Sequence, residues 1–129
     1  MSAEKRKILV VDDDPELLQL VRILLARAGF ETLTALDVPS ARTVLSSGTL
    51  PDVMVLDIML PGVSGIEFLE EIRAIADFDS LPILMLSALA DQQQIRAALD
   101  RGADRYLTKP YVASSLVSIV QEILSTKRR

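Results

Sequence analysis

The feature that most constrains the fold of this chain is a fivefold alternation between short apolar runs and longer segments of helical periodicity. The apolar runs, which we expect to be strands, occupy residues 7–11, 31–36, 52–56, 82–86 and 104–108. The segments between and after them, which we expect to be helices, occupy residues 15–28, 39–47, 65–76, 92–101 and 113–126. In the first of these segments the apolar residues recur at spacings of three and four, which predicts a single buried stripe along a helix.

The composition of the strands indicates how the sheet is covered. The first, third and fourth runs are apolar on both faces, as is typical of parallel strands that have helices on both sides. No linker, repeat or low-complexity segment interrupts the 129 residues, so the chain fits one domain. The sequence therefore predicts an α/β domain with a five-stranded parallel sheet and helices on both faces.

Helix-start signals agree with these boundaries at some positions and are weak at others. Asp14 before Pro15 is typical of an N-cap followed by proline at the first helical position. Ser64 and Glu67 have the spacing of a capping box. The segments that begin at residues 39 and 113 follow valine, so we expect their helices to lack a capping side chain.

Missing residue types exclude several kinds of chemistry. The chain has no Cys and no His, which excludes disulfides, thiolate nucleophiles, imidazole catalysis and zinc sites built on these ligands. A net charge of −4 argues against direct binding of nucleic acid. No apolar run approaches the roughly 20 residues of a membrane span, and no signal peptide is recognisable. We expect a cytoplasmic protein that does not bind membranes.

Polar residues stand at the carboxyl ends of four of the five predicted strands. The first strand is followed by Asp12, Asp13 and Asp14, and the third by Asp57. The fourth strand is followed by Ser87, and the fifth, which ends at Thr108, is followed by Lys109. In open parallel sheets, ligands bind outside the carboxyl ends of the strands, where the strand order reverses. These side chains are therefore expected to meet at one edge of the sheet.

Each of these residues also has an ordinary interpretation. Asp14 alone is a cap, Lys109 alone a solvated lysine, and Ser87 alone a turn hydroxyl, but four separate strands would not supply such groups together by accident. Several carboxylates at one edge repel one another by roughly 3 kcal/mol per pair at 5 Å. A hard divalent cation with oxygen ligands, Mg²⁺ or Mn²⁺, would offset that repulsion. We expect the metal to bridge Asp13 and Asp57, with Asp12 bound directly or through water.

Four stretches carry a resemblance to a known family: "ILVVDDDPE", "VLDIMLPGVSGIEFL", "PILMLSA" and "GADRYLTKPY". Together they resemble the receiver domain of bacterial two-component response regulators, over about residues 6 to 125. The resemblance implies a flavodoxin-like, doubly wound (βα)5 fold with strand order 2-1-3-4-5. It places the receiver domain at residues 6–126, after a disordered segment at 1–5 and before a C-terminal tail or start of a linker at 127–129.

The resemblance also implies a role for each residue at this edge. Asp57 matches the phospho-acceptor, a carboxylate nucleophile that becomes an aspartyl phosphate. Asp12 and Asp13, with Asp57 and the backbone carbonyl of Met59, match the ligands of Mg²⁺. Lys109 matches the lysine that pairs with the phosphoryl oxygens. Such a domain assists its own phosphorylation and dephosphorylation and is not otherwise an enzyme.

A conformational switch is implied by the same family. The hydroxyl of Ser87 would turn toward the phosphoryl group, and the aromatic ring of Tyr106 would move into the space left behind, past the small Ala88. The peptide bond between Lys109 and Pro110 is expected to be cis, as in the family. The movement would alter the face made by the fourth helix, the fifth strand and the fifth helix.

Partners follow from this interpretation. The phosphoryl donor would be a histidine kinase or a phosphotransfer protein, and the altered face would control an effector domain or a partner protein. A phosphorylation-dependent homodimer is a further expectation, although Arg105 stands where receivers of the winged-helix class usually have an acid. No direct nucleic-acid binding by this segment is expected.

Three alternatives remain from the residues themselves. The chain could be a degenerate receiver that acts only as an interaction module without accepting phosphate. Asp12 and Asp14 have the spacing of an aspartate-nucleophile phosphatase, although Glu16 stands where such enzymes have Thr or Val. A flavodoxin-like cofactor binder is disfavoured because no Gly-rich or Ser/Thr-rich phosphate loop follows the first strand.

Overall fold

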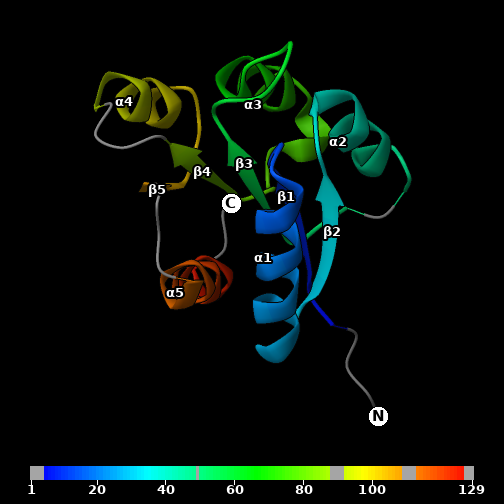
Figure 1. Ribbon diagram of the computed structural model, residues 1–129. Helices are drawn as coiled ribbons and strands as arrows, with labels where there is room; N and C mark the ends of the chain where they lie inside the picture. The colour runs from blue at the N-terminus through cyan, green and yellow to red at the C-terminus, as the bar shows by residue number, and fades with distance from the viewer. Residues whose placement is uncertain (1–4, 49, 88–91, 109–112, 127–129) are drawn as a thin grey trace.

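The computed structural model describes residues 5–48, 50–87, 92–108 and 113–126. It contains a five-stranded parallel sheet between two layers of helices (Figure 1). The strands are β1 (Lys7–Val11), β2 (Glu31–Ala35), β3 (Val53–Asp57), β4 (Ile83–Ser87) and β5 (Arg105–Thr108). The helices are α1 (Pro15–Arg27), α2 (Val38–Leu45), α3 (Gly65–Arg73), the short 3-10 helix η1 (Ala76–Phe78), α4 (Gln92–Asp100) and α5 (Ala113–Ser125).

The strand order is β2-β1-β3-β4-β5, which confirms the order 2-1-3-4-5. Helices α1 and α5 cover one face of the sheet, and α2, α3 and α4 cover the other (Figure 1). The chain goes from β1 outward to β2 and then returns past β1 to β3, so the strand order reverses between β1 and β3. The carboxyl ends of these two neighbouring strands are therefore the place where the fold favours a ligand site.

Alternating residues of the central strands build two separate cores. Leu9 and Val11 of β1 pack toward α2 and α3, whereas Ile8 and Val10 pack toward α1 and α5. All five residues of β3 are buried, as are all five of β4. These strands are apolar on both faces because both faces are covered by helices, as the sequence predicted.

Strands β3 and β4 each extend one residue beyond the predicted end. Asp57 pairs in register with Leu86 of β4, and Ser87 pairs with Thr108 of β5. The two polar residues are thus the last residues of paired strands rather than the first residues of loops. Because the sheet holds their backbones, the positions of both residues are fixed more closely than those of loop residues would be.

The predicted lack of a cap on the second helix was wrong. Helix α2 begins at Val38, one residue earlier than expected, and Asp37 is its N-cap. The Asp37 carboxylate accepts a hydrogen bond of 2.9 Å from the backbone N–H of Ser40. The capping of the first and third helices by Asp14 and Ser64 is as predicted. Val112, before the last helix, lies outside the described residues.

Substitution of this cap is expected to give a pH-dependent loss of stability. Hydrogen bonds from Ser40, first that of its side chain and then that of its backbone, lower the pKa of Asp37 below its ordinary value of 3.8. A lowered carboxyl pKa contributes stability above the unfolded pKa, and this contribution disappears as the pH falls through the folded pKa. Asp37→Ala should therefore lower the Tm by roughly 2–6 °C at pH 7.

The Tm difference should narrow as the pH is lowered below 3.8, which thermal unfolding followed by circular dichroism will measure. Asp77→Ala is the control, since Asp77 is an exposed aspartate of η1. An Asp37→Ala protein as stable as the wild type at pH 7 would contradict the capping role.

Helix α3 is tied to its neighbours along its length. Arg42 of α2 donates two hydrogen bonds, of 2.8 and 2.6 Å, to the carboxylate of Glu71, and these lower the pKa of Glu71. At the end of α3, Arg73 donates to the carbonyl of Gly102 at 2.9 Å and to the Asp104 carboxylate at 3.1 Å. Phe68, Leu69 and Ile72 are buried in the core below the helix. Helix α3 is therefore fixed through its buried face and near its C-terminal end.

Candidate functional site

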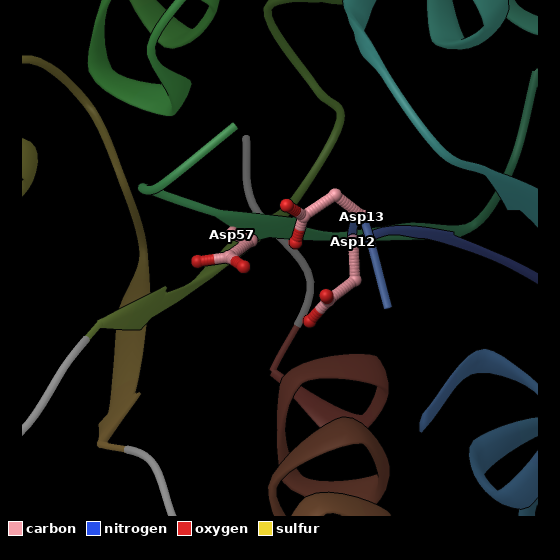
Figure 2. Close-up of side chains that lie close together, drawn as sticks. All are labelled: Asp12, Asp13 and Asp57. Atoms are coloured by element: carbon pink, nitrogen blue, oxygen red, sulfur yellow. The ribbon is translucent and has the colours of Figure 1, made fainter. Parts of the chain in front are cut away.

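The candidate site lies where β1 and β3 end side by side. Asp12 and Asp13 directly follow β1, and Asp57 is the last residue of β3 (Figure 2). One carboxylate oxygen of each residue lies within 4.8 Å of the others. The predicted meeting of these three side chains at the carboxyl edge of the sheet is therefore observed.

The three carboxylates differ in their exposure to solvent. Asp12 and Asp57 are buried, with 0% and 2% of their surface exposed, whereas Asp13 is exposed. The site is consequently closed on the side of the sheet and open on the side of Asp13. A small ion or a phosphoryl group can approach from that side.

Hydrogen bonds from backbone N–H groups two residues away in the sequence orient the two buried carboxylates. Oδ1 of Asp12 accepts a hydrogen bond of 3.0 Å from the backbone N–H of Asp14. Oδ1 of Asp57 accepts one of 3.1 Å from the backbone N–H of Met59. Each carboxylate is thus fixed by the chain two residues further on, as in an Asx turn.

Asp14 has a different role from Asp12 and Asp13. Its Oδ1 accepts hydrogen bonds from the backbone N–H groups of Glu16 and Leu17, at 3.0 and 3.3 Å, at the start of α1. The side chain therefore caps the helix, as predicted, and does not belong to the carboxylate cluster.

The charge arrangement favours a cation. At 4.8 Å and an effective dielectric constant of about 20, two carboxylates repel by roughly 3 kcal/mol, less where Asp13 is screened by solvent. Carboxylate oxygens are hard ligands, which suit Mg²⁺ and Mn²⁺ better than softer metals. The donor set of the three aspartates, two of them held by backbone hydrogen bonds, therefore fits a divalent cation of this class.

Ser87 is the second polar group at this edge. It is completely buried, and its Oγ has no hydrogen-bond partner among the described residues. Buried hydroxyls usually have a partner, so an unpaired one requires an explanation. Ser87 directly follows Leu86, the residue that pairs with Asp57 on the neighbouring strand. Ser87 therefore lies at the same edge of the sheet as the carboxylate cluster, and its hydroxyl is available as a donor.

Tyr106 points outward from β5, with 44% of its surface exposed. Its ring lines a surface hollow of about 520 Å³ together with residues of α4, among them Ile95 and Leu99. Met59 is also largely exposed, at 61%. Lys109, Pro110 and Ala88, for which roles were expected, lie outside the described residues.

Gly65 is a residue of this site whose contribution was not predicted. The first residue of α3 lies directly against the Asp57 backbone, and its N–H donates a hydrogen bond of 2.8 Å to the carbonyl of Ile58. The sequence contains one signal for it, a glycine eight residues after Asp57, but the contact itself depends on how α3 packs on the sheet.

Comparison with known proteins agrees with this geometry. The response regulator receiver domain family matches residues 8–121. The chain is 39% identical to the DNA-binding response regulator MtrA of Mycolicibacterium smegmatis over 122 residues, which are 94% of this chain and 51% of MtrA. It is 34% identical to the phosphate regulon transcriptional regulatory protein PhoB of Escherichia coli over 119 residues, which are 92% of this chain and 52% of PhoB. The chain thus spans about half the length of these relatives.

Solved structures give the same result. The receiver domain of a Francisella response regulator superimposes with a TM-score of 0.84 at 31% identity, covering 95% of this chain and 98% of the other. A response regulator receiver domain protein from Clostridium thermocellum superimposes with a TM-score of 0.85 at 30% identity, covering 94% and 95%. Within the described residues, no helix has the length and apolar character needed to cross a membrane. With the fold, the acidic pocket and these matches in agreement, the chain belongs to the response regulator receiver domain family.

Proposed function

We propose that the chain is a phosphorylation-controlled signalling switch that accepts a phosphoryl group on Asp57. The observation that carries the proposal is the meeting of Asp12, Asp13 and Asp57 at the carboxyl ends of β1 and β3, in a chain of the receiver family. The donor would be the phosphohistidine of a histidine kinase or of a phosphotransfer protein. This is a signalling role, in which the domain is modified and does not turn over a substrate.

In the transfer step, a carboxylate oxygen of Asp57 forms a bond to phosphorus. The bond between phosphorus and the histidine nitrogen of the donor breaks, and the imidazole leaves with the electron pair. The hydrogen bond from the Met59 N–H fixes Oδ1, so the Asp57 carboxylate meets the donor in one orientation. A nucleophile that is already held in line reacts faster, because the entropy of orienting it has been lost before the reaction begins.

Asp12, Asp13 and Asp57, with the backbone carbonyl of Met59, would hold Mg²⁺, or Mn²⁺ in its place. Such a cation, when bound, offsets the negative charge that gathers on the transferred phosphoryl oxygens. The buried position of Asp12 and Asp57 keeps water away from the inner side of the site. Lys109 is proposed to supply a second positive charge to the phosphoryl oxygens.

The proposal is tested with a small phosphodonor. Incubation of the chain with acetyl phosphate and Mg²⁺ should add one phosphoryl group, detected by intact-mass spectrometry. Borohydride reduction of the acyl phosphate, followed by peptide mapping, should assign it to Asp57. An unmodified mass would favour the degenerate interaction module. Sustained hydrolysis of a phosphomonoester would favour the phosphatase, although the capping role of Asp14 gives that alternative no support.

We infer that the output face consists of α4, β5 and α5. The hydroxyl of Ser87, buried and without a partner among the described residues, would donate to the phosphoryl oxygens, and Tyr106 would turn inward from its exposed position. The ring would then leave the hollow that it lines with α4. The changed face would act on an effector domain or partner protein, or form a phosphorylation-dependent homodimer.

The homodimer would differ from a dimer built on acids at the position of Arg105. Arg105 pairs within the chain with Glu122 of α5, at 3.4 Å, on the proposed output face. Both side chains are largely exposed, so the pair contributes little to stability.

Ser87→Ala is expected to separate phosphorylation from its output. The variant should accept the phosphoryl group at a rate within about threefold of the wild type, because the hydroxyl forms no part of the carboxylate cluster. The chemical-shift changes that phosphorylation causes in α4 and β5 should become much smaller, because the variant has no hydroxyl at position 87 to donate to the phosphoryl group. Two-dimensional ¹H–¹⁵N NMR under steady phosphorylation measures them.

Ser118→Ala, at an exposed serine of α5, is the matched control. Shift changes of full size in Ser87→Ala would show that the hydroxyl does not drive the switch.

A further inference from the structure

The start of α3 makes an unusually close approach to the backbone of Asp57. A Cβ atom added at Gly65 would overlap the carbonyl oxygen of Asp57, and it would lie 2.7 Å from Ile58 Cα and 2.9 Å from the Asp57 carbonyl carbon. All three are backbone atoms, which cannot turn aside as the end of a flexible side chain can. Only a residue without Cβ allows α3 to begin at this position.

Gly65 is not needed for its backbone conformation. Four other glycines, Gly29, Gly48, Gly62 and Gly102, have positive φ angles, between 81° and 109°, as expected of residues in turns. Gly65 has an ordinary helical backbone and is not one of them. The reason for glycine here is therefore the contact with the Asp57–Ile58 peptide.

The backbone of Ile58 is held from both sides. The N–H of Ile58 donates to Leu86 of β4 at 2.9 Å, and the carbonyl of Ile58 accepts from the N–H of Gly65 at 2.8 Å. The sheet and α3 thus grip the same residue. On either side of Ile58 stand the Asp57 carboxylate and Met59, whose N–H holds that carboxylate.

Helix α3 cannot easily withdraw from this contact. Its far end is fastened by Arg73 to Gly102 and Asp104, and its outer face by Glu71 to Arg42. A side chain at position 65 must therefore move the Asp57–Met59 segment, or break the hydrogen bond between Gly65 and Ile58 that supports this segment.

We propose that Gly65 is a positioning residue for Asp57. By letting α3 rest on the Asp57–Ile58 peptide, Gly65 fixes the segment from which the Asp57 carboxylate and the Met59 carbonyl project. The inference rests on the proposed function of Asp57 as phospho-acceptor and metal ligand. Gly65 touches neither metal nor phosphoryl group and acts through the backbone of the residue that does.

Gly65→Ala is the test, with metal binding as a readout that does not depend on phosphorylation. The affinity for Mn²⁺ alone, from the signal of free Mn²⁺ in electron paramagnetic resonance, should fall by about tenfold. The rate of phosphorylation by acetyl phosphate should fall by about 100-fold, as misplacement of a reacting group by 1 Å can cause. Both are measured at a temperature where circular dichroism shows the variant to be folded.

Gly29→Ala is the matched control. It also adds a methyl group at a positive φ, of 95°, in the turn after α1, and none of the described residues beyond its chain neighbours lies within 4 Å of the added atom. It should lower the Tm and leave Mn²⁺ affinity and phosphorylation rate unchanged. Wild-type Mn²⁺ affinity in Gly65→Ala, or an equal loss in Gly29→Ala, would overturn the proposal.

A measurement on the wild type covers the case in which Gly65→Ala does not fold. Mg²⁺ should slow amide hydrogen exchange at Gly65, because the metal ligands and the Gly65–Ile58 hydrogen bond belong to one held segment. The amide of Gly29, which donates to Ala26 at 3.0 Å, should be unaffected. Unchanged exchange at Gly65 would refute the coupling. If the wild type binds metal but takes no phosphoryl group, the proposed function fails, while the Mn²⁺ comparison still decides the role of Gly65.

Discussion

Replacing Asp57 by asparagine is expected to abolish phosphoryl incorporation. Asparagine keeps the size of the side chain and an oxygen that can accept the Met59 N–H, so the local fold should survive. It removes the anionic oxygen that attacks phosphorus, and an amide is a far weaker nucleophile. We expect the rate of labelling by acetyl phosphate in Mg²⁺ to fall by at least about 1,000-fold, to the limit of intact-mass detection.

The control for this variant is Asp77→Asn, at an exposed aspartate of η1 outside the carboxylate cluster. It should be labelled as fast as the wild type. Labelling of Asp57→Asn to the same extent as the wild type would remove the central claim, whatever residue carried the phosphoryl group. Loss of labelling in both variants would point to a general defect of folding.

Asp12→Asn is expected to be more stable than the wild type without metal and less stable than the wild type with metal. Without metal, the variant should be more stable by roughly 1–3 kcal/mol, because one of the clustered negative charges is gone. The Asn oxygen can still accept the hydrogen bond from the Asp14 N–H. On the proposed role, the three carboxylates lower the stability of the metal-free protein.

With Mg²⁺ the wild type should have the larger free energy of unfolding. A ligand at 100 times its dissociation constant stabilises the folded state by about 2.7 kcal/mol, and the wild type should gain this amount. The variant has lost a proposed ligand and should gain little. Urea unfolding in EDTA and in excess Mg²⁺ gives the four free energies of unfolding that are needed. A metal-free variant less stable than the wild type would contradict the repulsion argument, and an equal gain from Mg²⁺ would contradict the role of Asp12 as ligand.

Both predictions depend on one property of the fold. The sheet brings the ends of β1 and β3 together, although Asp12 and Asp57 are far apart in the sequence, and it buries both carboxylates. Neighbouring strands hold them close enough to repel and to share a cation. The same backbone supports Asp57 through the Ile58–Gly65 hydrogen bond.

Much of the architecture could be predicted because local patterns control it. Continuous apolar runs for β1, β3 and β4, the stripe along α1 and the caps at Asp14 and Ser64 all reflect interactions within a few residues. The errors lie at boundaries. Helix α3 ends at Arg73, where the sequence predicted helix up to residue 76, because Ile75 is extended and a separate 3-10 turn follows. The cap at Asp37 was not predicted because the helix begins at Val38, one residue before the proline that marks its start in the sequence.

The sequence by itself determined the alternation of strands and helices and the polar residues at the ends of four strands, because hydrophobic periodicity and turn chemistry act locally. Only the tertiary structure decided the distance among the three carboxylates, the burial of Asp12 and Asp57, and the lack of a partner for the Ser87 hydroxyl among the described residues. It alone placed Gly65 against the Asp57 carbonyl. These properties depend on how elements distant in the sequence pack, and a missing Cβ has meaning only once the atoms that would occupy its space are known.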